Sequence, residues 1–212
     1  MKGFYGFWHR ILAGPFRFLF RVHVEGRENE PGPEDGPYLV CANHTTAGDP
    51  VWLCASLRRQ QPHFMSKAEL FKIPLLGGLL RRLGAYPVER GSADLSSLRN
   101  TIGLLHDGKC VGMFPQGTRM PGVDPATTRV KSGVGIIAVR GGVQVLPVYI
   151  QSKKFCSKAF RRKRVIIGKP SPYETIAAMH ADHVEYSRIA EYIFGQVCAL
   201  SGEAEVSHEQ GK

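Results

Sequence analysis

Residues 41–50 read CANHTTAGDP and connect two segments of different character. The apolar run that leads into them, residues 38–42, predicts a short buried strand. Asp49, which a proline follows, predicts the start of a helix, because Asp can accept free N–H groups and Pro at the first helical position loses no needed donor. His44 and Asp49 would then face each other across one strand-to-helix turn, with Gly48 available to bend the chain.

The facing pair of His44 and Asp49 has two interpretations. A carboxylate beside an imidazole can fix its tautomer and support its positive charge, as a general base requires. No Ser or Cys stands nearby in a nucleophile setting, so such a pair would activate a hydroxyl of the substrate itself. In the other interpretation Asp49 is only a helix cap and His44 is structural, and this decapeptide alone leaves both open.

The composition suits one globular domain with at most a small appendage, because 43% of the 212 residues are hydrophobic. The formal net charge of +10 indicates an anionic partner, which could be nucleic acid, a membrane surface or an acidic ligand. The five cysteines show no CxxC spacing, which favours reduced thiols in a cytoplasmic compartment and no zinc site. No run reaches the roughly 18–20 apolar residues that would span a bilayer.

The N-terminal residues 4–20 mix aromatic side chains with Arg and His, a composition suited to the headgroup region of a membrane. The pair Gly14-Pro15 predicts two short helices there, the second continuing to about Val24. A helical hairpin packed on the domain core is the alternative. Residues 25–36 are rich in Pro, Gly and acids and are predicted to form a linker loop. These patterns divide the chain into membrane-association helices with a linker (1–30), an α/β domain (31–202) and a polar, frayed tail (203–212).

Strand and helix patterns alternate along the rest of the chain, which predicts an α/β fold with a central sheet flanked by helices. Residues 67–83 are strongly apolar, and we expect a bent helical stretch that is broken at Pro74 and at the glycine pair 77–78. This stretch belongs either to the core or to a second membrane-contacting surface. The apolar spacing between Ile189 and Leu200 predicts a final amphipathic helix.

Two further loops carry residue types suited to phosphate. Arg90 follows a predicted strand, and an Arg there can fork onto a phosphate with paired donors, although a lone Arg is more often a surface residue. The segment FPQGTR, residues 114–119, follows another predicted strand. Its Gly117 lets the backbone approach a ligand, Thr118 offers a hydroxyl, and Arg119 adds a second guanidinium.

In chain order, HTTAGD, GAYPVER, FPQGTR and VLPVYI resemble the four sequence blocks of the glycerolipid acyltransferase family, in particular its bacterial 1-acyl-sn-glycerol-3-phosphate acyltransferases. The resemblance covers about residues 37–170, and the N-terminus is similar to the family's two-helix membrane module. It implies a mixed central sheet flanked by helices, with that two-helix module in front. It also implies His44 and Asp49 as the catalytic pair, and substrate binding by Lys67, Arg90, Gln116, Gly117, Thr118 and Arg119.

Gln116 departs from the family pattern, which usually has Glu at this position. A neutral amide can hydrogen-bond to phosphate, but it cannot orient an Arg by charge. The resemblance places Gln116 beside the phosphate and its arginines, so we expect the departure to affect substrate affinity rather than chemistry.

The activity that the resemblance implies is transfer of a fatty acyl group from an acyl-carrier-protein or coenzyme A thioester to the sn-2 hydroxyl of lysophosphatidic acid. The product is phosphatidic acid, an intermediate of phospholipid biosynthesis, and no metal or organic cofactor is implied. The expected partners are the lysolipid, the acyl thioester and an anionic membrane surface. The expected location is the cell membrane, with the protein peripheral or monotopic on the cytoplasmic face.

Two other functions stay open. One is an acyltransferase of the same fold that uses another lysolipid acceptor, such as a lyso-amino lipid. The other is a non-catalytic membrane-binding protein, in which Gln116 marks decay. The cationic run 161–164, with Lys153, Lys154 and Lys158, could be a solvated face, hold anionic lipid or dock an acidic acyl carrier protein. We expect no nucleic-acid partner, because no recognition module accompanies the charge.

Overall fold

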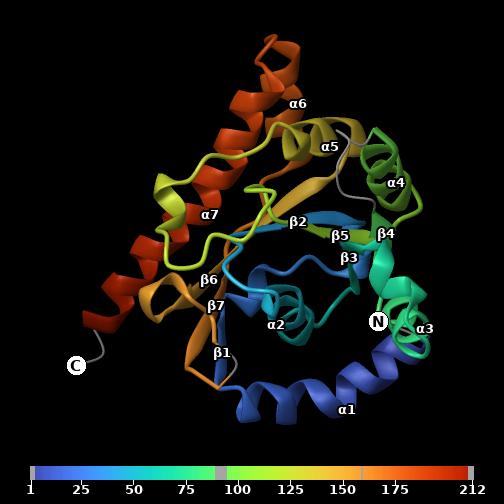
Figure 1. Ribbon diagram of the computed structural model, residues 1–212. Coiled ribbons are helices and arrows are strands. Elements are labelled where there is room, and N and C mark those ends of the chain that lie inside the picture. The colour runs from blue at the N-terminus through green and yellow to red at the C-terminus, as the bar shows by residue number, and fades with distance from the viewer. Residues whose placement is uncertain (1–2, 89–94, 159, 210–212) are drawn as a thin grey trace.

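The computed structural model describes residues 3–88, 95–158 and 160–209, which form a mixed α/β fold (Figure 1). Their seven-stranded sheet has the order β1-β7-β6-β2-β5-β3-β4, and its neighbours are parallel except for the antiparallel pair β6 and β7. The strands are β1 (Val22–Glu25), β2 (Tyr38–Ala42), β3 (Pro62–Lys67), β4 (Tyr86–Val88), β5 (Cys110–Met113), β6 (Gln144–Ser152) and β7 (Lys163–Ile167). The helices are α1 (Gly3–Leu19), α2 (Asp49–Ser56), α3 (Leu76–Arg82), α4 (Leu95–His106), α5 (Gly133–Gly141), α6 (Tyr173–Ala181) and α7 (Tyr186–Glu209).

The buried strand predicted over residues 38–42 is confirmed by β2, because all five of its residues are buried. Val40 faces the layer formed by α1 and α2, whereas Leu39 and Cys41 face the layer that contains α5 and α7. A parallel strand that is covered on both faces is expected to be a continuous apolar run rather than an alternating one. Strand β2 lies at the centre of the sheet, between β6 and β5, and leads directly into the His44 turn.

The N-terminal prediction of two helices is wrong, because α1 continues through Pro15 as one helix. Side chains on both sides of Pro15 hold α1 against α2: Tyr5 and His9 bind the carbonyl oxygen of Cys54, and Arg17 binds that of Ala55. These carbonyls lie in the last turn of α2, where the helix itself provides no donors. The hydrogen bonds compensate for the one that Pro15 cannot make.

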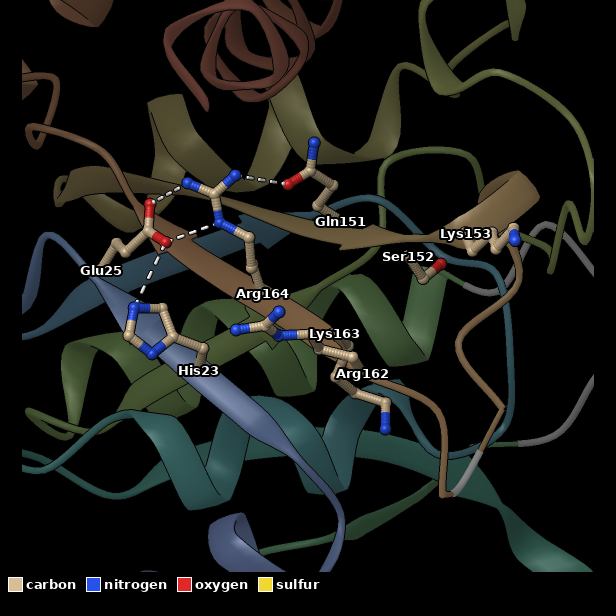
Figure 2. A pocket seen from close by; sticks show the side chains of 8 residues that line it. All are labelled: His23, Glu25, Gln151, Ser152, Lys153, Arg162, Lys163 and Arg164. Atoms are coloured by element: carbon tan, nitrogen blue, oxygen red, sulfur yellow. Dashed lines mark hydrogen bonds and ion pairs between the residues drawn. The ribbon is translucent and has the colours of Figure 1, made fainter. Parts of the chain in front are cut away.

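The chain after α1 forms a strand, not the predicted continuation of a helix. Strand β1 pairs in parallel with β7, so the sheet begins inside residues 1–30, where only helices and a linker were expected. Arg164 of β7 holds β1 in place through two hydrogen bonds of 2.6 Å to the carboxylate of Glu25 (Figure 2). The predicted linker loop then folds into two short 3₁₀ turns, and its Glu30 is buried against the backbone N–H groups of Arg58 and Arg59.

Residues 67–83 bend where proline predicts it, but the glycines do not break the helix. A 3₁₀ turn over Ala68–Lys72 precedes α3, and Leu75 between them has a positive φ of 64°. Gly77 lies inside α3, and a Cβ there would come within 2.2 Å of the carbonyl oxygen of Phe71. The glycine therefore allows close packing of the two turns.

The C-terminal region differs from the predicted frayed tail, since the backbone of α7 continues through Glu209. Helix α6 was also not predicted. Both helices cover the sheet on the face opposite α1 and α2 (Figure 1).

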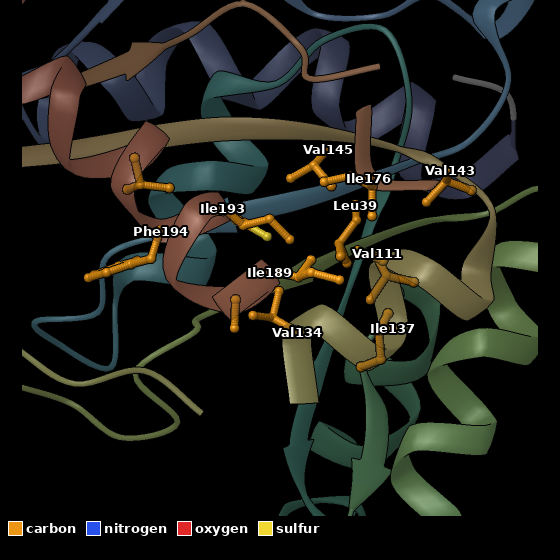
Figure 3. Close-up of a cluster of buried hydrophobic side chains, with 14 of the residues drawn as sticks. Leu39, Val111, Val134, Ile137, Val143, Val145, Ile176, Ile189, Ile193 and Phe194 are labelled. Carbon is orange, nitrogen blue, oxygen red and sulfur yellow. The ribbon is translucent and has the colours of Figure 1, made fainter. Parts of the chain in front are cut away.

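The larger core cluster lies between the sheet and helices α4 to α7 (Figure 3). Ile189, Ile193 and Val197 repeat every four residues along α7 and are at most 1% exposed, as the predicted amphipathic helix requires. Helix α5 approaches α7 closely at Gly135, where an added Cβ would lie 2.2 Å from the carbonyl oxygen of Tyr186.

Gly135→Ala should therefore lower stability by about 1–3 kcal/mol, because two backbones must separate. The matched control is Gly195→Ala in α7, where nothing lies within 4 Å of an added Cβ. It should raise stability by roughly 0.5–1 kcal/mol through the helix preference of Ala. Thermal unfolding measures both changes, and equal effects of the two substitutions would contradict the close helix contact.

Candidate active site

The predicted site residues follow the carboxyl ends of parallel strands. His44 comes after β2, Lys67 ends β3, and residues 114–119 come after β5. Parallel strands bring their carboxyl ends to one edge of a sheet, which is where α/β proteins bind ligands. Arg90 lies outside the described residues.

His44 and Asp49 form the predicted pair, with 2.9 Å between Nδ1 of the imidazole and Oδ2 of the carboxylate. An ionised carboxylate can only accept, so Nδ1 carries the shared proton. Nε2 is then the nitrogen left to take a proton from a substrate. The ring stacks on Phe114 with centroids 4.0 Å apart and planes at 14°, which fixes its orientation.

The carboxylate of Asp49 is entirely buried and bound by the chain on both oxygens. Oδ2 accepts the backbone N–H groups of Thr45 at 2.6 Å and Thr46 at 2.8 Å, in addition to His44. Oδ1 accepts the hydroxyls of Thr46 at 2.9 Å and Ser157 at 2.6 Å. Burial by itself raises the pKa of Asp49, but the hydrogen bonds from His44, Ser157, Thr46 and Thr45 outweigh it and hold the pKa below its usual value. The carboxylate therefore stays ionised at neutral pH beside the imidazole.

The turn that carries this pair differs from the prediction in two details. Asp49 does not cap the helix, because its carboxylate points back to the turn and the cap position is Gly48, without a side-chain hydrogen bond. Gly48 has an ordinary φ of −79°, so the bend does not need glycine. A Cβ at Gly48 would come within 3.0 Å of the Trp52 ring, so the glycine provides space for the indole.

Asn43 fixes the chain just before His44. Its side-chain amide donates to the carbonyl oxygen of Ile150 at 3.1 Å and accepts the backbone N–H of Ile150 at 2.7 Å. The side chain thus replaces a backbone pairing at the point where β2 separates from β6. The position of His44 is consequently fixed by Asn43, which is bound to the backbone of Ile150, and by the buried Asp49.

The side chain of Gln116 is buried and binds the backbone of His44. Its Oε1 accepts the N–H of His44 at 2.7 Å, and its Nε2 donates to the Thr128 hydroxyl at 2.9 Å. The N–H of Met120 also donates to the carbonyl oxygen of His44 at 2.9 Å. Gln116 is 3% exposed and links the 116–120 loop to His44.

The remaining residues of this loop, Gly117, Thr118 and Arg119, are exposed. Gly117 has a positive φ of 70°, and the stem of Lys131 lies so close that an added Cβ would be 2.7 Å from its Cδ. Lys131 is thus a cation beside the loop that the sequence analysis did not include. Lys67 is exposed at the end of β3.

Two further residues of the site, Ser157 and Asn43, were not predicted from the sequence. Ser157 lies 108 residues from Asp49 in the chain, and no local pattern indicates that a loop after β6 returns to the catalytic turn. Asn43 stands next to His44 at the end of a buried strand, and an amide at such a position is a usable signal. Among the described residues, no group of three or more His, Cys, Asp or Glu could hold a metal ion.

The geometry agrees with comparisons to known proteins. The profile of the Acyltransferase family matches residues 21–151, which include His44, Asp49 and the 116–120 loop. The chain belongs to the acyltransferase family. A 1-acyl-sn-glycerol-3-phosphate acyltransferase of Bacillus subtilis (strain 168) is 32% identical over 70% of this chain and 73% of its own length. A lyso-ornithine lipid O-acyltransferase of Pseudomonas aeruginosa is also 32% identical, over 64% of this chain and 49% of its own.

The fold is similar to a solved acyltransferase structure. The crystal structure of the 1-acyl-sn-glycerophosphate (LPA) acyltransferase PlsC from Thermotoga maritima superimposes with a TM-score of 0.59 at 26% identity. The match covers 89% of this acyltransferase and 78% of that protein. The predicted central sheet with flanking helices is therefore confirmed, whereas the two-helix module is replaced by the single α1.

Ser157→Ala should reduce kcat about tenfold, because Asp49 loses a hydrogen bond of the charge-assisted kind. The lost bond also raises the pKa of Asp49, so the acidic limit of activity should move to higher pH. Ser201→Ala removes a hydroxyl that binds only the backbone of α7 and is the matched control. A pH profile of kcat and KM measures these effects. A higher KM with unchanged kcat and acidic limit would assign Ser157 to substrate contact.

Gln116→Leu should reduce kcat about tenfold, because the buried N–H of His44 loses its acceptor. Gln116→Glu keeps that acceptor and should leave kcat nearly unchanged. It should lower the melting temperature, since the Thr128 hydroxyl already donates to Pro125 and receives no donor from a carboxylate. Steady-state kinetics and thermal unfolding test both variants. If Gln116→Leu changes only the KM for the acceptor, the side chain contacts substrate after all.

Proposed function

We propose that this acyltransferase moves a fatty acyl group from an acyl thioester to the sn-2 hydroxyl of 1-acyl-glycerol-3-phosphate. The observation that carries the proposal is the fixed pair of His44 and Asp49, in which the Ser157 and Thr46 hydroxyls donate to the carboxylate. The names of the relatives from Bacillus subtilis and Thermotoga maritima support the acceptor. Both an acyl-carrier-protein and a coenzyme A thioester fit this chemistry.

The proposed reaction is one direct acyl transfer. Nε2 of His44 takes the proton of the acceptor hydroxyl while that oxygen attacks the thioester carbonyl. The imidazolium is stabilised by the ionised Asp49, which accepts the Nδ1 proton. The tetrahedral intermediate then expels the thiolate, which recovers the proton from His44. The products are the ester and the free thiol, and His44 returns to its starting state.

The acceptor phosphate is assigned to the exposed cations beside the site. Arg119 continues the 116–120 loop, which is bound to both backbone groups of His44. Thr118 and the backbone of Gly117 lie on the same loop, and Lys67 ends β3. Arg90, which lies outside the described residues, is included on the basis of the sequence alone. A phosphate bound there would hold the lysolipid, and a fixed position of its hydroxyl near Nε2 lowers the entropic barrier to reaction.

The purified protein should form phosphatidic acid from lysophosphatidic acid and one of the two thioesters. His44→Ala should lower kcat by roughly 10²–10⁴-fold, the usual contribution of a general base, with little change in melting temperature. Asp49→Asn should also be severe, because the imidazolium loses its charge partner. Product formation with both donors measures this, and His44→Ala at near-native turnover would contradict the mechanism.

The relative from Pseudomonas aeruginosa favours a lyso-ornithine lipid as the second candidate acceptor. Both lipids should be offered in the same assay. Preference for the acceptor without a phosphate would reject the phosphate assignment while keeping the mechanism of His44.

We also propose that α1 attaches the protein to the cytoplasmic face of the membrane. The outer face of α1 exposes large apolar side chains, with Phe7 at 59% and Phe18 at 89%, while its inner face packs on α2. Arg82 of α3 lies over the ring of Phe4, and Leu75 next to α3 is 94% exposed, so the apolar surface extends onto α3. Among the described residues, no helix is long and apolar enough to cross a bilayer. An amphipathic helix of this kind lies in the headgroup region.

The triple variant Phe7→Ser, Ile11→Ser and Phe18→Ser should lower binding to phosphatidylcholine vesicles at least tenfold, because each side chain loses apolar burial in the lipid. Deletion of residues 1–24 is a poorer test, since it removes most of β1. Leu95→Ser with Val123→Ser removes exposed apolar groups elsewhere and is the control. Vesicle sedimentation measures binding, and equal loss in the control would contradict a specific membrane face.

A further inference from the structure

A groove of about 680 Å³ lies on strands β1, β6 and β7 (Figure 2), and its lining includes no residue of the His44 turn. Its size falls within the range of ligand sites. Four of its lining side chains are Lys or Arg and one is acidic. The four cations are Lys153, Arg162, Lys163 and Arg164, and Glu25 and His23 also line the groove.

Two of the four cations are engaged within the fold. Arg164 binds Glu25 and donates to the side-chain oxygen of Gln151 at 3.0 Å. Lys163 directs its Nζ to the carbonyl oxygen of Phe20 at 3.0 Å and to the Trp52 ring at 4.3 Å. These two cations therefore shape the groove.

The other two cations, Lys153 and Arg162, are exposed at the ends of the β6–β7 connection. Among the described residues, neither side chain has a hydrogen-bond or ion-pair partner. The groove thus offers two cationic side chains to an anionic ligand.

Apolar side chains stand beside these cations. Phe160, in the same connection, is 65% exposed and stacks on Phe20 with centroids 5.1 Å apart. Phe18 and Leu19, which precede Phe20 at the end of α1, are also exposed. Cations next to exposed aromatic groups match the boundary of a membrane, where rings are buried in lipid and charges meet headgroups.

We propose that this groove binds the phosphate of an anionic lipid headgroup, in addition to the lipid that reacts at His44. Arg162 and Lys153 are the contacts that recognise the phosphate, since guanidinium and ammonium groups both pair with phosphate oxygens. The proposal rests on the membrane attachment of α1, but not on the acyl transfer. It assigns α1 to apolar insertion and the groove to selection of anionic lipid.

The test compares Lys153→Gln/Arg162→Gln with Arg140→Gln/Lys169→Gln. The control removes the same charge from exposed residues at the opposite end of β6 and β7. Sedimentation is measured with phosphatidylcholine vesicles and with vesicles that also contain phosphatidylglycerol. The groove variant should lose about 10- to 30-fold in binding to the anionic vesicles. It should bind pure phosphatidylcholine like the native protein, because α1 is unchanged.

Equal losses in the groove variant and its control would overturn the proposal, since overall charge would then explain the binding. A second measurement follows the His23 imidazole of the native protein by NMR during titration with soluble dihexanoyl phosphatidylglycerol, glycerol 3-phosphate and inorganic phosphate. Saturable shifts with the lipid at lower concentration than with the other two support the proposal. Equal affinity for all three would assign the groove to soluble phosphate instead. Acyl transfer to detergent-solubilised acceptor reports separately on the proposed function.

Discussion

The site depends on one buried charge, the carboxylate of Asp49. An ionised carboxylate without exposed surface is stable only when hydrogen bonds replace the water it has lost. Five donors do so here, two from the backbone of the turn, two from hydroxyls and one from His44. The shape of the turn is therefore set by the charge that it must solvate. This explains why Asp49 points back to residues 45 and 46 and does not cap α2.

The sequence was most informative where the physics is local. The apolar run of β2, the Asp-Pro start of α2 and the four-residue spacing in α7 each follow from burial or backbone geometry, and all three are confirmed. The motif spacing also brought His44 and Asp49 together correctly. Local reasoning was wrong at Pro15, where contacts to α2 outweigh the loss of one helix hydrogen bond. It could not find β1, because a four-residue strand at a sheet edge depends on Arg164, far away in the chain.

Gln116 shows how tertiary contacts change the meaning of a motif. In the sequence it stands inside a phosphate-binding pattern, next to an exposed glycine and arginine. In the structure its amide accepts the backbone N–H of His44 and donates to the hydroxyl of Thr128. A neutral amide suits this place because one end accepts and the other donates, which a carboxylate cannot do. Gln at this position, in place of the usual Glu, is thus consistent with an intact catalytic loop.

Helix α2 connects the catalytic turn to the proposed membrane helix. Its first residue is Asp49, and the carbonyl oxygens of its last turn accept hydrogen bonds from Tyr5, His9 and Arg17 of α1. A helix of eight residues is about 12 Å long. Lys163 secures the other end of α1 through the carbonyl oxygen of Phe20, even though burial lowers the pKa of Lys163 to about 8. With α1 in the headgroup region, this connection would hold His44 at a fixed height above the lipid. The hydroxyl of a lysolipid would then reach His44 while the acyl chain of the lysolipid stays in the membrane.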